Sequence, residues 1–129
     1  MKKILHIIPR FNCTPEGIIT GGSLSAMLNL VNASKSDYDS VIYSNMASDQ
    51  ACIDKAKSLP LCLYLDENNA PAGTPYYGAA FAARSLRTLL QNKAWGADVI
   101  CGHSGFPFYG MIHALAGNVL RKPSIHALC

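Results

Sequence analysis

The chain has 129 residues, of which half are hydrophobic and 15% are charged, and its net charge is +3 at neutral pH. This length fits one domain, and the composition supports a packed core and argues against disorder. The small net charge, without a dense cluster of lysine and arginine, argues against nucleic acid as a partner. No apolar run approaches the roughly 20 residues needed to span a bilayer.

The number and spacing of the cysteines bear on the redox state of the compartment in which the protein works. There are five, at positions 13, 52, 62, 101 and 129, and none has C-x-x-C spacing. Those at 62 and 101 fall inside apolar runs, where cysteine behaves as a small hydrophobic residue. An odd number in this pattern is typical of a reducing environment, so the sequence predicts a cytoplasmic protein without structural disulfides or zinc.

The chain opens with a strand, a loop and a helix. Residues 2–8 form a short run rich in isoleucine that stops at Pro9, as a strand buried on both faces would. The loop ends in Gly21 and Gly22, and Ser23 is a candidate N-cap for the helix. The apolar face of that helix is predicted from Leu24, Met27, Leu28 and Val31.

The glycine pair therefore lies in the connection between a buried strand and a helix. Glycine permits a positive φ and lets a ligand approach the main chain, and the free N–H groups of a helix N-terminus favour an anion. A second interpretation is that the pair only makes the turn. The spacing matches neither a Walker loop nor G-x-G-x-x-G, so ATP and NAD have little support.

Strands and helices alternate along the rest of the chain. Further strands are expected at 39–44, 61–65, 97–102 and 124–128, and further helices at 48–58, 76–93 and 109–120.

This alternation predicts an α/β fold, a Rossmann-like, doubly wound parallel sheet of about five strands in three αβα layers. With the common strand order 3-2-1-4-5, the order reverses between the first and fourth strands. Ligands bind such sheets outside the carboxyl ends of the strands at that point. We therefore expect the loops at 9–22 and 103–108 to face each other across a crevice.

His103 and Ser104 follow directly on the fourth predicted strand. A histidine in this position can bond a ligand hydroxyl or act on a proton, and the alternative is a histidine bonded to nearby backbone. His6 and His126 lie within apolar strands and are expected to be satisfied core histidines. A metal site formed by His6, His103 and His126 is accordingly not expected.

For the charged side chains outside these strands, we weigh a binding role against ordinary exposure to solvent. Glu16, in the first loop, either touches a substrate or is a solvated carboxylate, and the second is favoured. Arg84, Arg87 and Lys93 either attract an anionic membrane surface or form an ordinary solvated helix face, and again the second is favoured.

Three segments resemble family 4 glycosyltransferases of the GT-B fold. The opening strand and the glycine pair resemble the start of that family. Residues 97–107, ADVICGHSGFP, are similar to its D-V-I-H-A-H-S segment, and residues 122–128, KPSIHAL, to its K-P-V-V-H-T-L strand. The resemblance covers nearly the whole chain, although residues 45–96 match only in pattern.

The resemblance implies that residues 1–129 are the N-terminal, acceptor-side domain of a retaining glycosyltransferase. Such an enzyme moves a sugar from a nucleotide-sugar to a sugar, polysaccharide or lipid-linked acceptor. The donor-binding C-terminal domain is absent from the sequence, so we expect a truncated domain that is inactive alone. No metal or other cofactor is expected. The implied location is the cytoplasm, including the inner face of the membrane.

The resemblance also implies roles for individual residues. Gly21 and Gly22 would approach the donor phosphates, and His103 would lie near the transferred sugar as the catalytic residue. Two positions depart from the family, since Cys101 replaces the first histidine of an H-x-H pair and Cys129 stands where a histidine often ends the fifth strand. The remaining residues expected near the acceptor or donor sugar are Glu16, Ser23, Ser104, Gly105 and Phe106.

Two alternatives remain open. The first is one half of a GT-B-like nucleotide-sugar epimerase, which shares the two-domain fold. The second is a binding or assembly module without catalysis, in which the last strand is an exposed edge that forms a homo-oligomer.

Overall fold

A computed structural model describes residues 1–8, 22–44, 50–66, 79–103 and 109–127. Its strands are β1 (Lys2–Ile8), β2 (Tyr38–Ser44), β3 (Cys62–Leu65), β4 (Val99–His103) and β5 (Ser124–Ala127). Its helices are α1 (Gly22–Ser34), α2 (Gln50–Ser58), α3 (Ala79–Gln91) and α4 (Tyr109–Leu120), with a short helical turn, η1 (Lys93–Gly96), after α3.

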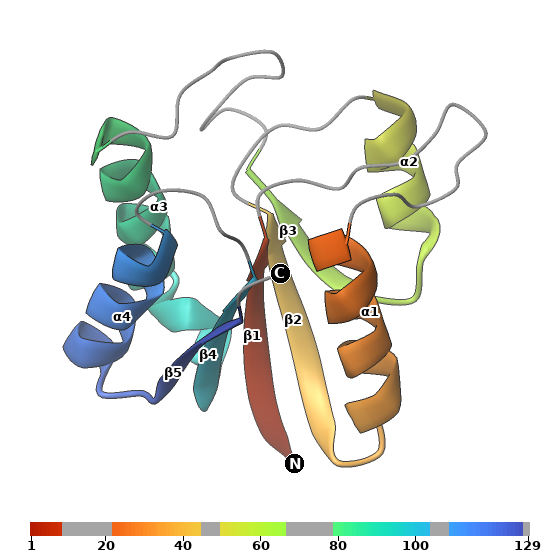
Figure 1. The fold of residues 1–129 in the computed structure, drawn as a ribbon, viewed down its shortest axis with the longest axis horizontal. Helices are drawn as coiled ribbons and strands as arrows, with labels where there is room; N and C mark the ends of the chain where they lie inside the picture. The colour runs from red at the N-terminus through yellow and green to blue at the C-terminus, as the bar shows by residue number, and fades with distance from the viewer. Residues whose placement is uncertain (9–21, 45–49, 67–78, 104–108, 128–129) are drawn as a thin grey trace.

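The five strands form one parallel sheet in the order β3-β2-β1-β4-β5. Helices α1 and α2 lie on one face of the sheet and α3 and α4 on the other, as Figure 1 shows. The predicted Rossmann-like α/β fold and its strand order are therefore confirmed. In the described ranges, no helix is both long and apolar enough to cross a bilayer.

Alternation along β1 divides the core between the two faces. Leu5 and Ile7 belong to the cluster on the α3/α4 face, whereas Ile8 belongs to the cluster on the α1/α2 face. All three side chains are almost completely buried. Because side chains of a strand point alternately to opposite faces, His6 lies on the α1/α2 face, and it is completely buried there.

The predicted helix at 76–93 is too long at its C-terminal end. Helix α3 stops at Gln91, and Lys93, Ala94 and Trp95 adopt positive φ angles of 50°, 49° and 49°. Left-handed backbone costs about 1–2 kcal/mol for each residue with a side chain. Packing stabilises the turn: Ala94 is completely buried, and the Trp95 ring stacks on Tyr64 with centroids 4.4 Å apart.

We expect Lys93→Gly to stabilise the protein by up to about 1 kcal/mol. Glycine at φ 50° removes the left-handed penalty, and its greater freedom in the unfolded chain offsets only part of that gain. The matched control is Arg87→Gly, another exposed basic residue, which lies inside α3 and should cost about 1 kcal/mol. Urea unfolding of both variants measures this difference in sign, and destabilisation by Lys93→Gly would contradict it.

Two further expectations are corrected. His103 was expected in a loop but is the last residue of β4, paired with Ala127 of β5. Cys52 is disulfide-bonded, although no structural disulfide was expected. Cys62 and Cys101 are thiols. Cysteine usage therefore no longer argues for a reducing compartment.

Candidate functional site

The strand order reverses between β1 and β4. Two of the predicted site residues lie at the carboxyl ends of the strands there. Gly22 is the first residue of α1, and His103 is the last residue of β4. Helix α1 contacts both β1 and β4. Figure 1 shows α1 beginning beside the carboxyl end of β1 and running back along the sheet. The topology thus brings Gly22 and His103 to the same edge.

The other predicted site residues cannot be placed. The side chain of Ser23, in the first turn of α1, lies outside what the structure describes. The residues outside the described ranges are Glu16, Gly21, Ser104, Gly105 and Phe106.

Strand register gathers three polar side chains around β1 and β4. His6 pairs with Cys101 in the parallel ladder, so the two side chains lie next to each other on the same face. His103 is two residues further along β4, and the two-residue period of a strand returns it to that face. The side chains of His6, Cys101 and His103 therefore form one cluster on the α1 side of the sheet, called here the β1–β4 cluster.

The β1–β4 cluster is buried and tightly spaced. Its three residues are 0%, 7% and 2% exposed, in chain order. Nδ1 of His6 lies 2.9 Å from Nε2 of His103, a hydrogen-bond distance, and the ring centroids are 5.1 Å apart. One potential ligand atom from each residue lies within 4.8 Å of the other two. Nε2 of His6 is buried and has no hydrogen-bond partner among the described atoms.

Burial makes both imidazoles poor bases. Desolvation lowers the pKa of His6 to about 4, with a smaller contribution from the charge of His103. Desolvation likewise lowers the pKa of His103 to about 4, with a smaller contribution from His126. At neutral pH both rings are therefore uncharged, and each offers one N–H donor and one acceptor nitrogen.

A second histidine pair lies on the opposite face of the sheet. Nδ1 of His126, on β5, is 3.0 Å from Nε2 of His113, on α4, and the two rings stack with centroids 4.8 Å apart. A Cβ on Gly102 would overlap the His113 ring, so the absence of a side chain there admits the imidazole against β4. Burial lowers the pKa of His113 to about 4, with smaller contributions from His126 and His103.

This arrangement corrects the expectations for the histidines. His126 faces His113 and not His6, because its register partner is Gly102, whose neighbours on β4 face the opposite side. His6 is a buried core histidine, as predicted, but it is only half satisfied: its Nδ1 is hydrogen-bonded to His103, whereas its Nε2 has no partner in the described part of the chain. Sequence reasoning missed Cys101 and His113 as members of the two clusters.

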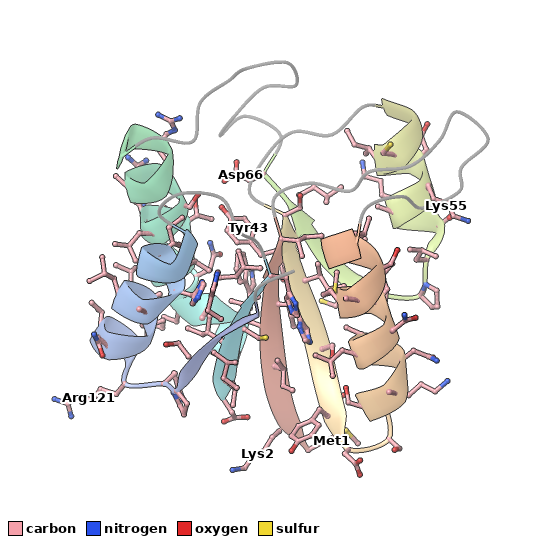
Figure 2. All side chains as sticks on the ribbon, in the orientation of Figure 1. Met1, Lys2, Tyr43, Lys55, Asp66 and Arg121 are labelled. Atoms are coloured by element: carbon pink, nitrogen blue, oxygen red, sulfur yellow. The ribbon has the colours of Figure 1, made fainter. Side chains whose placement is uncertain are left out.

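A third polar contact lies at the carboxyl edge of β2 and β3. The Tyr43 hydroxyl donates a hydrogen bond to Asp66 at 2.9 Å, and Figure 2 labels both residues near the carboxyl ends of the strands. Burial, followed by the charge of Asp66, raises the pKa of Tyr43 far above its usual value. Tyr43 therefore remains protonated and acts as a donor that ties β2 to the segment after β3.

Together these features define a Rossmann-like α/β domain with a buried His-Cys-His cluster at its reversal of strand order. No family model, curated protein or solved structure matches the chain.

Proposed function

We propose that this chain is the N-terminal, acceptor-side domain of a retaining glycosyltransferase of the GT-B type. It would act together with a donor-binding domain to move a sugar from a nucleotide-sugar to a sugar, polysaccharide or lipid-linked acceptor. The observation that supports this proposal is the position of Gly22 and His103 at one edge, where β1 and β4 are neighbours. That edge is where ligands bind doubly wound sheets.

Each of the two residues has a role that fits its surroundings. The first N–H groups of α1, at Gly22, would bond the leaving diphosphate and stabilise its developing negative charge. His103 is neutral at pH 7 because burial lowers its pKa to about 4. It would therefore orient a sugar hydroxyl through a hydrogen bond and would not supply a proton as an imidazolium ion.

The proposal also implies which partners the protein has and where it works in the cell. With a nucleotide-sugar donor and a glycan or lipid-linked acceptor, the protein would work in the cytoplasm, in peripheral contact with the inner face of the membrane. Arg87 is exposed on α3 and would contribute to such contact. No metal is required for this transfer in the family that the chain resembles.

Chemical-shift mapping of the isolated chain with millimolar UDP-, GDP- and ADP-sugars tests the site. We expect shifts at the Gly22 amide and at the His103 ring for at least one donor. The His113 ring serves as the internal control, because it lies on the opposite face of the sheet. Shifts confined to other parts of the chain would overturn the proposal.

Calorimetry of the same mixtures tests whether the donor binds mainly to the other domain. We expect a dissociation constant weaker than micromolar, and no turnover. A helix N-terminus in water contributes only about 0.3–1 kcal/mol, whereas a micromolar site needs roughly 8 kcal/mol. The nucleotide base and ribose would have their partners on the other domain. A micromolar constant for any donor would mean that the donor site lies in this chain.

The alternative of an assembly module has one observation in its favour. β5 is one of the two edge strands of the described sheet, and its Ile125 is 57% exposed. Unpaired edge strands with apolar side chains associate with other chains. Analytical ultracentrifugation should then show self-association that Ile125→Lys removes, and a strict monomer at high concentration would count against this function. Nothing in the described residues favours an epimerase half over a transferase.

A further inference from the structure

The β1–β4 cluster has the donor set of a metal site. It combines one thiol with two imidazoles, and thiolate with imidazole is the ligand set that zinc and copper prefer. The ligand atoms lie within 4.8 Å of one another, with the two closest imidazole nitrogens 2.9 Å apart. Around a zinc ion, with bonds of about 2.0–2.3 Å, neighbouring ligand atoms are roughly 3.3–3.8 Å apart. Small side-chain rotations therefore suffice.

The backbone supplies the rigidity that such a site needs. Cys101 and His103 are alternate residues of one strand, and His6 is the register partner of Cys101 on the neighbouring strand. Both strands are interior members of a five-stranded sheet. The three Cα positions are thus fixed by ladder hydrogen bonds, and only side-chain rotations remain to be set.

The cluster is poorly explained as part of the core. The other fully buried residues of β1 are aliphatic, namely Leu5, Ile7 and Ile8. In this setting the hydrogen bond between the two histidines leaves Nε2 of His6 buried without a partner among the described atoms. Buried polar groups without partners are uncommon, and a bound ion is one of the accepted explanations for them.

We propose that His6, Cys101 and His103 together bind one transition-metal ion of the Zn²⁺ class. On binding, the Cys101 thiol loses its proton to solvent and its sulfur forms a bond to the ion, while the two imidazoles coordinate as neutral ligands. No change of oxidation state is involved. Three protein ligands leave a fourth position of the tetrahedron for water or another ligand.

This site shares His103 with the proposed glycosyl transfer but does not depend on that proposal. The ion would hold the His103 ring in one orientation and fix which nitrogen carries the proton, as metal-bound histidines commonly do. It would not touch the sugar. The test uses no nucleotide-sugar, so its failure and the failure of the proposed function are distinguishable.

The experiment titrates the metal-free chain with Co²⁺ and then with Zn²⁺. We expect one Co²⁺ per chain, the near-ultraviolet charge-transfer band of a thiolate–Co²⁺ bond, and the intense visible bands of a four-coordinate ion. Zn²⁺ should abolish these bands by displacement. Cys101→Ser should remove the charge-transfer band, and His6→Gln should weaken binding at least tenfold. Far-UV circular dichroism establishes that each variant folds.

The control variants replace a cysteine and a histidine that lie outside the β1–β4 cluster. Cys62→Ser removes another thiol, exposed on β3, and His126→Gln removes a histidine from the opposite face. Both should bind Co²⁺ as the parent chain does. X-ray absorption of the zinc-loaded parent needs no variant, and we expect one sulfur at about 2.3 Å and two imidazole nitrogens at about 2.0–2.1 Å. Absence of a zinc–sulfur shell, or loss of binding in either control, would overturn the proposal.

Discussion

The metal-free chain should unfold on acidification between pH 6.5 and pH 4. Three histidines, His6, His103 and His113, are buried, and their pKa values in the folded chain are about 4. In the unfolded chain a histidine has its ordinary pKa of about 6.5. The unfolded state therefore binds more protons throughout this interval, and the free energy of unfolding falls as the pH falls.

The expected loss is large compared with the stability of a domain. The stabilising contribution is complete above pH 6.5 and is gone near pH 4, where the folded chain is protonated as well. Each histidine accounts for about 3 kcal/mol across that range. His6 and His103 are hydrogen-bonded to each other, so their titrations are coupled and the three contributions do not simply add. Their combined loss is still a large fraction of the roughly 5–15 kcal/mol that stabilises an ordinary domain, and we expect the midpoint of acid unfolding inside the interval.

Urea unfolding at a series of pH values, with a chelator present, measures this dependence. The matched variant is His113→Gln, which keeps a polar side chain but does not titrate. Its stability should vary with pH less steeply than that of the parent chain, by up to about 1.4 kcal/mol per pH unit. A parent chain that stays folded well below pH 4, or an unchanged slope in the variant, would contradict the assignment of buried neutral histidines.

The fold was predictable because the strongest signals in the sequence are local. Strands buried on both faces of a parallel sheet read as apolar runs. β1 and β4 each contain a short one, at residues 4–8 with His6 as the one interruption and at residues 99–101. Helix α4 was predicted with its observed bounds. The end of α3 was not, because Lys93, Ala94 and Trp95 are compatible with a helix. Their left-handed turn depends on burial of Ala94 and on the stack between Trp95 and Tyr64.

The candidate site was predictable only in part. Topology places Gly22 and His103 at one edge, and topology follows from the order of elements. The two histidine pairs depend instead on register, since a shift of one residue moves a side chain to the other face of the sheet. No local signal in one sequence sets the register of β1 against β4, or of β5 against β4. The alternation of Cys101 and His103 in one strand was the available clue.

Gly102→Ala should destabilise the protein by about 1–3 kcal/mol, the usual cost of overpacking a core. The added Cβ would overlap Cε1 and Nδ1 of His113 and lie 3.0 Å from its Nε2. The ring cannot easily give way. It is 2% exposed, sits on α4 and stacks on His126. The backbone of Gly102 is equally fixed, because its ladder partners lie on both sides, Ile7 on β1 and His126 on β5.

A double-mutant cycle separates this clash from a general intolerance of alanine at position 102. His113→Ala alone should cost a few kcal/mol, because it leaves a cavity beside β4. In that background Gly102→Ala should be close to neutral or stabilising, since the new methyl group enters the space that the ring has left. The coupling free energy between the two sites should be about 1–3 kcal/mol and favourable. If Gly102→Ala costs the same in both backgrounds, the His113 ring is not packed against β4, and the buried pair on this face is arranged differently.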